Sequence, residues 1–189
     1  LLSHVKACLR MKKLLLSGLI SLAGLVVGAA NPFITHMYTA DPSARVFNDR
    51  LYVYPSHDED TATKFRMVDW HVFSSDDLIT WTDHGVAFSL KHTSWAKKEA
   101  WAPDCIERNG LYYFYYPVEH SKIGVAVSNQ PVGPFRDPLD SALIHVESKG
   151  VVCTRDFIDP AVFIDDDGQA YLYMGQLVVN AIKLNEDMI

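Results

Sequence analysis

Three stretches of the chain repeat one pattern: residues 45–54 (RVFNDRLYVY), 106–114 (IERNGLYYF) and 163–173 (FIDDDGQAYLY). In each stretch, β-branched and aromatic residues flank a short polar turn rich in Asn, Asp or Gly, which is the pattern of a β-hairpin. The turns lie at Asn48, Asn109 and Asp167, so they follow one another at intervals of 61 and 58 residues. The sequence therefore predicts one such hairpin about every 60 residues.

The outer part of the pattern also repeats. After the first hairpin, an expected strand at 70–74 leads through the turn at 75–79 to Trp81, and after the third an expected strand at 178–184 leads to the similar segment 185–189. The middle copy has a strand at 122–128, but its fourth strand is not assigned. Because about 60 residues with two hairpins make one four-stranded sheet, and such sheets stack radially, we predict an all-β propeller.

The length sets the size of this propeller. A ring needs four or more blades, or about 240 residues at this period, whereas the repeats here amount to about two and a half blades. We therefore expect residues 31–189 to be the N-terminal part of a longer domain.

The first thirty residues differ from the rest in charge and hydropathy. They hold four basic residues and no acid, so the formal net charge of −6 becomes −10 without them. Lys12 and Lys13 precede an apolar run at 14–27 and the small residues 28–30, which is the arrangement of a secretory signal cleaved after Ala30. The run is shorter than the roughly 20 residues that span a bilayer, so a retained anchor is the less favoured alternative. We expect a secreted or periplasmic protein with no membrane contact after signal removal.

The remaining composition excludes other classes. With 49% hydrophobic and 21% charged residues, the chain is not collagen-like, low in complexity or disordered. Its acidic balance argues against nucleic acid as a partner. Cys105 and Cys153 are expected to be buried free thiols in strands, although an oxidising compartment would permit a disulfide. No paired Cys or His spacing indicates a metal, so no metal ligand is predicted.

An aspartate precedes each of the three hairpins: Asp41 before Pro42, Asp104 after Pro103, and Asp159 before Pro160. The first strand of each propeller blade lines the axis, so these carboxylates should meet on one face of the central cavity. Clustered carboxylates raise at least one pKa and commonly serve metal binding or acid–base chemistry. The alternative for each one alone is a structural turn, since Asp-Pro is a common turn dipeptide.

Aromatic residues near these aspartates favour a sugar ligand. Trp101 is the strongest candidate for contact, and Phe157 precedes Asp159. His57, next to Asp58, follows the second strand of the first repeat and is a further candidate, with a hydrogen-bonded turn as its alternative.

The motifs TADPS (39–43), SHD (56–58), WAPD (101–104), IDP (158–160) and DDDG (165–168) together resemble those of glycoside hydrolase family 43, over residues 31–189. That family has a five-bladed β-propeller fold and cleaves xylan or arabinan side chains and oligosaccharides with inversion. The resemblance implies that Asp41 is the general base that activates water and that Asp159 tunes the pKa of the general acid and orients it. It also implies that Trp101 and Asp104 line the sugar subsite.

The family's general acid is a glutamate in a later motif that is not found here. We expect it beyond Ile189, and we expect residues 31–189 alone to be inactive. No cofactor is predicted; the calcium ion that the family often carries on the propeller axis would belong to the longer protein, because its histidine lies in a later part of the chain.

The leading hypothesis is an inverting glycosidase acting on xylose- or arabinose-containing oligosaccharides or polysaccharides. A binding propeller without catalysis is the first alternative. The second is a related five-bladed enzyme that acts on fructosides with retention, in which the first aspartate is a nucleophile. The anomer of the released product separates inversion from retention.

Overall fold

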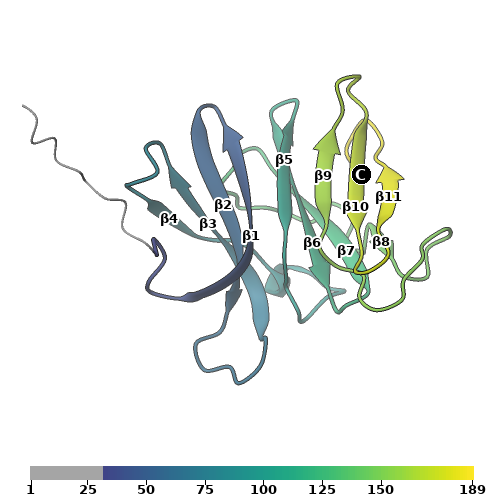
Figure 1. Cartoon of the computed structure of the whole chain (residues 1–189), viewed down its shortest axis with the longest axis horizontal. Helices are drawn as coiled ribbons and strands as arrows, with labels where there is room; N and C mark the ends of the chain where they lie inside the picture. Colours follow the sequence, from purple (N-terminus) through teal and green to yellow (C-terminus); the bar gives the residue numbers. More distant parts are fainter. Residues whose placement is uncertain (1–31) are drawn as a thin grey trace, which may run out of the picture.

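The computed structural model describes residues 32–189, so the predicted signal segment lies outside the described residues. Three antiparallel sheets follow one another along the chain (Figure 1). The first contains β1 (Tyr38–Phe47), β2 (Arg50–Asp58), β3 (Met67–Ser75) and β4 (Thr82–Ser89). The second contains β5 (Asp104–Arg108), β6 (Leu111–Val118), β7 (Lys122–Ser128) and β8 (Ile144–His145), and the third β9 (Ala161–Ile164), β10 (Ala170–Met174) and β11 (Asn180–Lys183). The predicted partial propeller of two complete blades and an incomplete third is confirmed.

The predicted hairpin turns explain the register of the first two sheets. Phe47 pairs with Arg50 across Asn48 and Asp49, which both have positive φ, of 51° and 62°. Arg108 pairs with Leu111 across Asn109 and Gly110, again with two positive φ values. Two-residue turns of this kind need a left-handed conformation at both positions, which Asn, Asp and Gly adopt most readily. The third hairpin has a longer loop, at 165–169, between Ile164 and Ala170.

The fourth strand of the middle blade, left unassigned from the sequence, is β8. It has only two residues and pairs with the beginning of β7, where Ile123 lies opposite Ile144. The segment after β7 first makes an isolated bridge from Arg136 to Val127 and only later returns to the sheet edge. A two-residue strand has no alternation from which the sequence could have predicted it.

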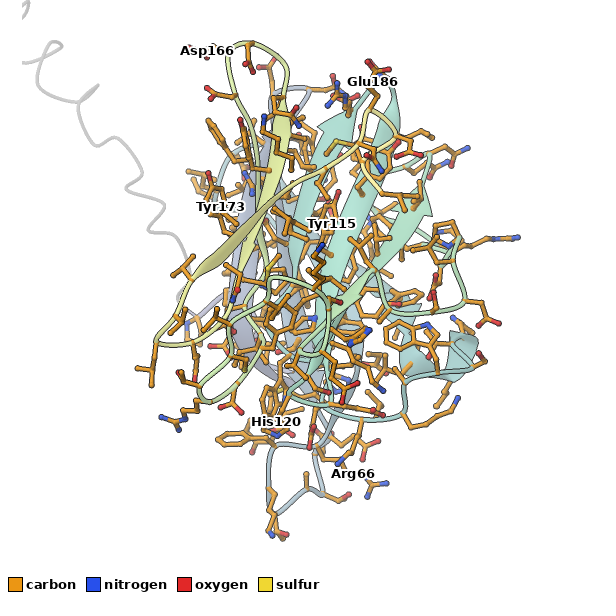
Figure 2. All side chains as sticks on the ribbon, turned by 90° about the vertical axis from the view of Figure 1, so that its right-hand side faces the viewer. Arg66, Tyr115, His120, Asp166, Tyr173 and Glu186 are labelled. Atoms are coloured by element: carbon orange, nitrogen blue, oxygen red, sulfur yellow. The ribbon has the colours of Figure 1, made fainter. Side chains whose placement is uncertain are left out.

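Two apolar clusters join the three sheets, and β6 contributes to both. Phe114 and Tyr116 pack against the first sheet, in a cluster with Trp70. Tyr113 and Tyr115 face the other way and pack against the third sheet. Figure 2, viewed from the third sheet, shows Tyr115 between the strands, where its hydroxyl donates to the carbonyl of Met188 at 2.7 Å. Because side chains alternate along a strand, a central blade that is apolar on both faces can bind a neighbour on each side.

The two cysteines differ from expectation in one respect. Cys105 is buried in β5 as predicted, whereas Cys153 is exposed and lies in a loop. The amide of the preceding Val152 donates to the Asn180 side chain at 2.9 Å, so the strand-like run around Cys153 is held by a side chain and joins no sheet. Both thiols are free.

The only helix in the described range is the 3-10 turn η1 (Leu90–His92). Residues 32–189 therefore hold no helix with the length and hydropathy needed to cross a bilayer.

Candidate active site

The first strands of the three blades, β1, β5 and β9, lie side by side (Figure 1). Their entry ends surround one cavity of about 770 Å³, lined by residues 40–45, 101–104 and 158–161 with Phe65, Met67 and Gln176. The structure thus brings together Asp41, Asp104 and Asp159, as the repeat predicts. Figure 2 shows His120, a neighbour of the cavity residue Trp101, and the turn residue Asp166 at opposite ends of the molecule, so the cavity lies away from the hairpin turns.

The backbone is strained at two of the three aspartates. Asp41 has a φ of 47° and Asp159 a φ of 57°, and a proline follows each. Left-handed conformations are unfavourable for residues with a Cβ atom, although Asp tolerates them better than most, and such strain is concentrated at functional sites. Asp41 also lies in a register shift between Ala40 and Ser43 of β1, and bulges of this kind redirect a side chain out of the strand's regular alternation.

Asp41 and Asp159 are both accessible from the cavity and interact electrostatically. Partial burial, the Asp41 carboxylate and the Asp156 carboxylate together raise the pKa of Asp159 above its ordinary value. Two nearby carboxylates do not ionise independently, because each negative charge disfavours the other. Asp159 therefore holds a proton more tightly than an isolated aspartate would.

Asp104 differs from the other two. It is buried, and its Oδ1 accepts hydrogen bonds from the Ser43 hydroxyl at 2.5 Å, the Arg45 Nε at 3.0 Å and its neighbour's amide, that of Cys105, at 2.9 Å. Its Oδ2 accepts hydrogen bonds from the Arg45 Nη2 and, at 2.8 Å, from the Val162 amide. Asp104 lines the cavity, so its place at the sugar subsite stays a prediction, but both of its oxygens are already occupied by donors from all three blades.

Trp101 lines the cavity and is half-buried. Its carbonyl accepts a hydrogen bond from the Trp70 indole at 2.7 Å, whereas its own Nε1 is buried without a hydrogen-bond partner in the described structure. Its ring meets the edge of His120, with centroids 4.3 Å apart. His120 in turn lies between Asp156, at 2.8 Å, and Glu99, at 3.3 Å. Trp101 therefore packs against a histidine that lies between two acidic side chains.

Comparison with known protein sequences identifies the family of this chain. The model of the family described as "Glycosyl hydrolases family 43" matches residues 29–189. The chain belongs to glycosyl hydrolase family 43. Among curated relatives, it is 46% identical over 160 residues to xylosidase/arabinosidase 43A of Humicola insolens, covering 77% of this chain and 46% of that protein. It is 39% identical over 153 residues to a xylosidase/arabinosidase of Bacteroides ovatus, covering 74% and 44%.

Solved structures of the family agree with the fold. An α-L-arabinofuranosidase from Clostridium thermocellum superposes with a TM-score of 0.72 at 44% identity, covering 84% of this chain and 55% of that one. CoXyl43, a β-xylosidase/α-arabinofuranosidase from a compost microbial metagenome solved with xylotriose, gives a TM-score of 0.73 at 36% identity, covering 86% and 59%. The chain spans about half the length of the curated relatives it matches.

Two residues predicted to contact the sugar in this family 43 chain lie outside the cavity. Phe157 is fully buried in the cluster between the second and third sheets, so its ring faces protein on all sides. His57 is part of β2, rather than a turn, and its Nδ1 is 2.8 Å from the Asp69 carboxylate. Neither of them lines the cavity. Both assignments are therefore corrected.

The sequence analysis missed two residues that shape the family 43 cavity. Phe65 lies on the connection between β2 and β3, lines the cavity and is 75% exposed. A lone aromatic residue in the polar stretch 59–66 was the available signal, because a large apolar side chain has no packing reason to be there. Arg45 was missed because its partner Asp104 is 59 residues away in the sequence.

The axial calcium ion of the family stays a prediction for the longer protein. In the range 32–189, one group of three or more potential metal ligands converges, namely His57, Asp69 and His71, and none of them lines the cavity. Calcium prefers six to eight oxygen ligands, which two imidazoles do not offer. No step of the chemistry is therefore assigned to calcium.

Proposed function

We propose that this chain carries part of the active site of an inverting glycoside hydrolase. The observation that carries the proposal is the pair Asp41 and Asp159, brought by the first strands of two blades to one cavity whose third aspartate, Asp104, is neutralised by Arg45. An unneutralised carboxylate at such a site can accept a proton, and a second one beside it can control where protons are held. Family membership supports the same chemistry.

In the proposed reaction, a water molecule attacks the anomeric carbon on the face opposite the leaving group. Asp41 accepts a proton from this water as the new carbon–oxygen bond forms, and the glycosidic carbon–oxygen bond breaks. The leaving oxygen takes a proton from a general acid, which is not assigned among the described residues. Inversion needs space for the water between base and sugar, with the two carboxyl groups roughly 6.5 to 9.5 Å apart.

Asp159 is proposed to act as a positioning residue. Its raised pKa means that a proton or a positively polarised group near it is stabilised. A carboxylate in this state orients the neighbouring acid by hydrogen bonding and raises the pKa of that acid in turn. Its effect should therefore appear in the pH dependence of kcat as well as in the rate.

We propose xylose- or arabinose-containing oligosaccharides as substrates. The names of the relatives include xylosidase, arabinosidase and α-L-arabinofuranosidase, and CoXyl43 was solved with xylotriose. The half-buried Trp101 and the exposed Phe65 supply flat apolar faces beside the aspartates, which suit the C–H faces of a pentose ring.

The test uses the protein expressed from its complete coding sequence. We expect hydrolysis of aryl β-xyloside or α-arabinofuranoside and, by proton NMR, a first product of inverted anomeric configuration. Asp41→Asn removes the proposed base and should slow this hydrolysis. Its matched control is Asp49→Asn, at an exposed aspartate of the β1–β2 turn. Retention would assign Asp41 as a nucleophile, and binding of xylotriose without any hydrolysis would favour the carbohydrate-binding alternative. Either outcome overturns the proposal.

We also propose that the protein is exported to the periplasm or the exterior. The support is the sequence pattern of two lysines, an apolar run at 14–27 and small residues at 28–30. N-terminal sequencing of the protein recovered from the culture medium or periplasm should give Asn31 as the first residue, and recovery of a longer chain from the membrane fraction would contradict the proposal.

A further inference from the structure

A cluster of three potential metal ligands lies on one face of the first blade. His57 of β2 is the cross-strand neighbour of Asp69 in β3, and His71 follows two residues later, so all three side chains point to the same side of the sheet. One ligand atom from each residue lies within 4.8 Å of the others. The Nδ1 of His57 is 2.8 Å from Asp69, and the Nε2 of His71 is 4.0 Å from the same oxygen.

The second nitrogen of His71 faces another carboxylate. His71 is only 8% exposed, and its buried Nδ1 has no hydrogen-bond partner in the described structure. That nitrogen is 3.9 Å from an oxygen of Asp83 in β4, which is itself held by His36 and by the Gly85 amide. Metal-binding histidines commonly donate a hydrogen bond from their second ring nitrogen to a carboxylate, which fixes the orientation of the ring. Asp83 is placed to take this role but lies beyond hydrogen-bond distance of His71 here.

The two histidine rings also lie next to each other, with centroids 4.9 Å apart. The imidazoles are therefore close enough to bind one ion together with Asp69.

We propose that His57, Asp69 and His71 bind a divalent transition-metal ion of the zinc class, with Asp83 as the outer partner of His71. Two imidazoles and one carboxylate form a ligand set that zinc accepts, whereas calcium requires oxygen ligands. Zinc bonds of about 2.1 Å place tetrahedral ligand atoms roughly 3.4 Å apart. Side-chain rotation must therefore bring His71 closer to Asp69 and move the His57 nitrogen slightly away from it. The sequence did not indicate this site because its ligands come from two strands and form no short motif.

The bound ion would stabilise the first blade. It would join β2 to β3 directly and, through Asp83, would hold β4 in the same unit. Because these ligands do not line the cavity, the proposal is independent of the proposed glycosidase activity.

The first experiment is a zinc titration of the full-length, metal-stripped protein against a chromophoric chelator. We expect one zinc ion per chain at this site, with affinity reduced by at least tenfold in His71→Gln and in Asp69→Asn. Asp83→Asn should weaken binding about tenfold through the outer partner. The matched control is His92→Gln, at an exposed histidine in η1, which should bind zinc like the wild type. Calcium in excess should not displace the zinc.

Two further readouts keep the proposal testable if a variant fails to fold. In the wild type, zinc should raise the melting temperature by about 4 °C or more, and by less than half of this in His57→Gln. A long-range proton–nitrogen spectrum of the wild type should show changed ring nitrogens at two histidines only. Absence of zinc binding by the wild type, unchanged affinity in His71→Gln, or coordination by other histidines would each overturn the proposal.

Discussion

The entry to the middle blade differs from the entries to the first and third. All three hold an aspartate at the same place in the repeat, yet Asp41 and Asp159 are accessible and strained, whereas Asp104 is buried and receives five hydrogen bonds. The cation that neutralises Asp104 comes from the neighbouring blade, as Arg45. Equivalent positions in a repeat therefore bring the three aspartates to one cavity, but the local backbone and the neighbouring side chains decide which carboxylates stay available for chemistry.

The largest expected effect is the loss of activity when Asp41 is replaced. Asp41→Asn in the full-length protein should reduce kcat by about 10² to 10⁴ because the attacking water loses its base. The melting temperature should stay within about 2 °C of the wild type, since the substitution keeps the shape of an accessible side chain. Steady-state kinetics and calorimetry check both. A variant that kept at least half of the wild-type kcat would remove Asp41 from the role of base.

Replacing Asp104 instead of Asp41 tests the stability of the folded protein. Asp104→Ala should lower the free energy of unfolding by about 3 kcal/mol, because it leaves the Arg45 guanidinium and the Val162 amide without their acceptor. Urea denaturation measures the change. In a double-mutant cycle, Arg45→Met combined with Asp104→Leu should lose less than the sum of the single losses. Simple additivity would show that the pair does not couple the blades.

A smaller effect is expected at the rim of the cavity. Phe65→Ala should raise KM for an oligosaccharide substrate about tenfold and leave kcat nearly unchanged, because the ring contributes binding that is equal in the ground and transition states. Phe163→Ala is the control, at a half-exposed phenylalanine of β9 that does not line the cavity. Equal KM values for the two variants would exclude Phe65 from substrate binding.

The smallest effect concerns the pKa of Asp159. Asp41→Asn should lower this pKa, since it removes the neighbouring negative charge that contributes to raising it. Carbon-13 NMR titration of the carboxyl groups measures the shift, and Asp104→Asn serves as a comparison, because Asp104 is not among the groups that raise this pKa. An unchanged pKa in Asp41→Asn would mean that the two carboxylates are not coupled.

The same shift has a consequence for stability. A carboxyl with a raised folded-state pKa binds its proton more tightly in the folded state, so its contribution to stability falls as pH rises from its ordinary value, 3.8, through the folded-state pKa. Asp159→Asn should remove this fall and be at least as stable as the wild type at pH 7. Melting temperatures across this pH range check the sign.

Much of the fold could be predicted because local chemistry determines it. Asn48 and Asn109 begin turns that need left-handed residues, and the alternating apolar residues on either side form the predicted strands. The two-residue strand β8 and the exposed loop at Cys153 could not be predicted, since each depends on contacts with distant residues.

The site was predictable in position but not in detail. The period of the repeat placed Asp41, Asp104 and Asp159 together, as the structure does. It could not reveal that Arg45 crosses to the next blade, because no local pattern links residues 59 apart. Nor does an aromatic residue beside an aspartate indicate which way its ring faces. Phe157 turns into the core, while Phe65, in a polar loop, faces the cavity.

Arg45 also affects how the repeats unfold. In arrays whose repeats contact only their neighbours, unfolding can proceed one repeat at a time. Here the Arg45 guanidinium donates to the Val162 carbonyl, 117 residues later, so fraying of the third repeat must break a contact with the first. The amides of Cys105 and Val162 both donate to the Asp104 carboxylate. They should therefore exchange with deuterated solvent at one common, slow rate, as members of a single cooperative unit that extends across all three repeats.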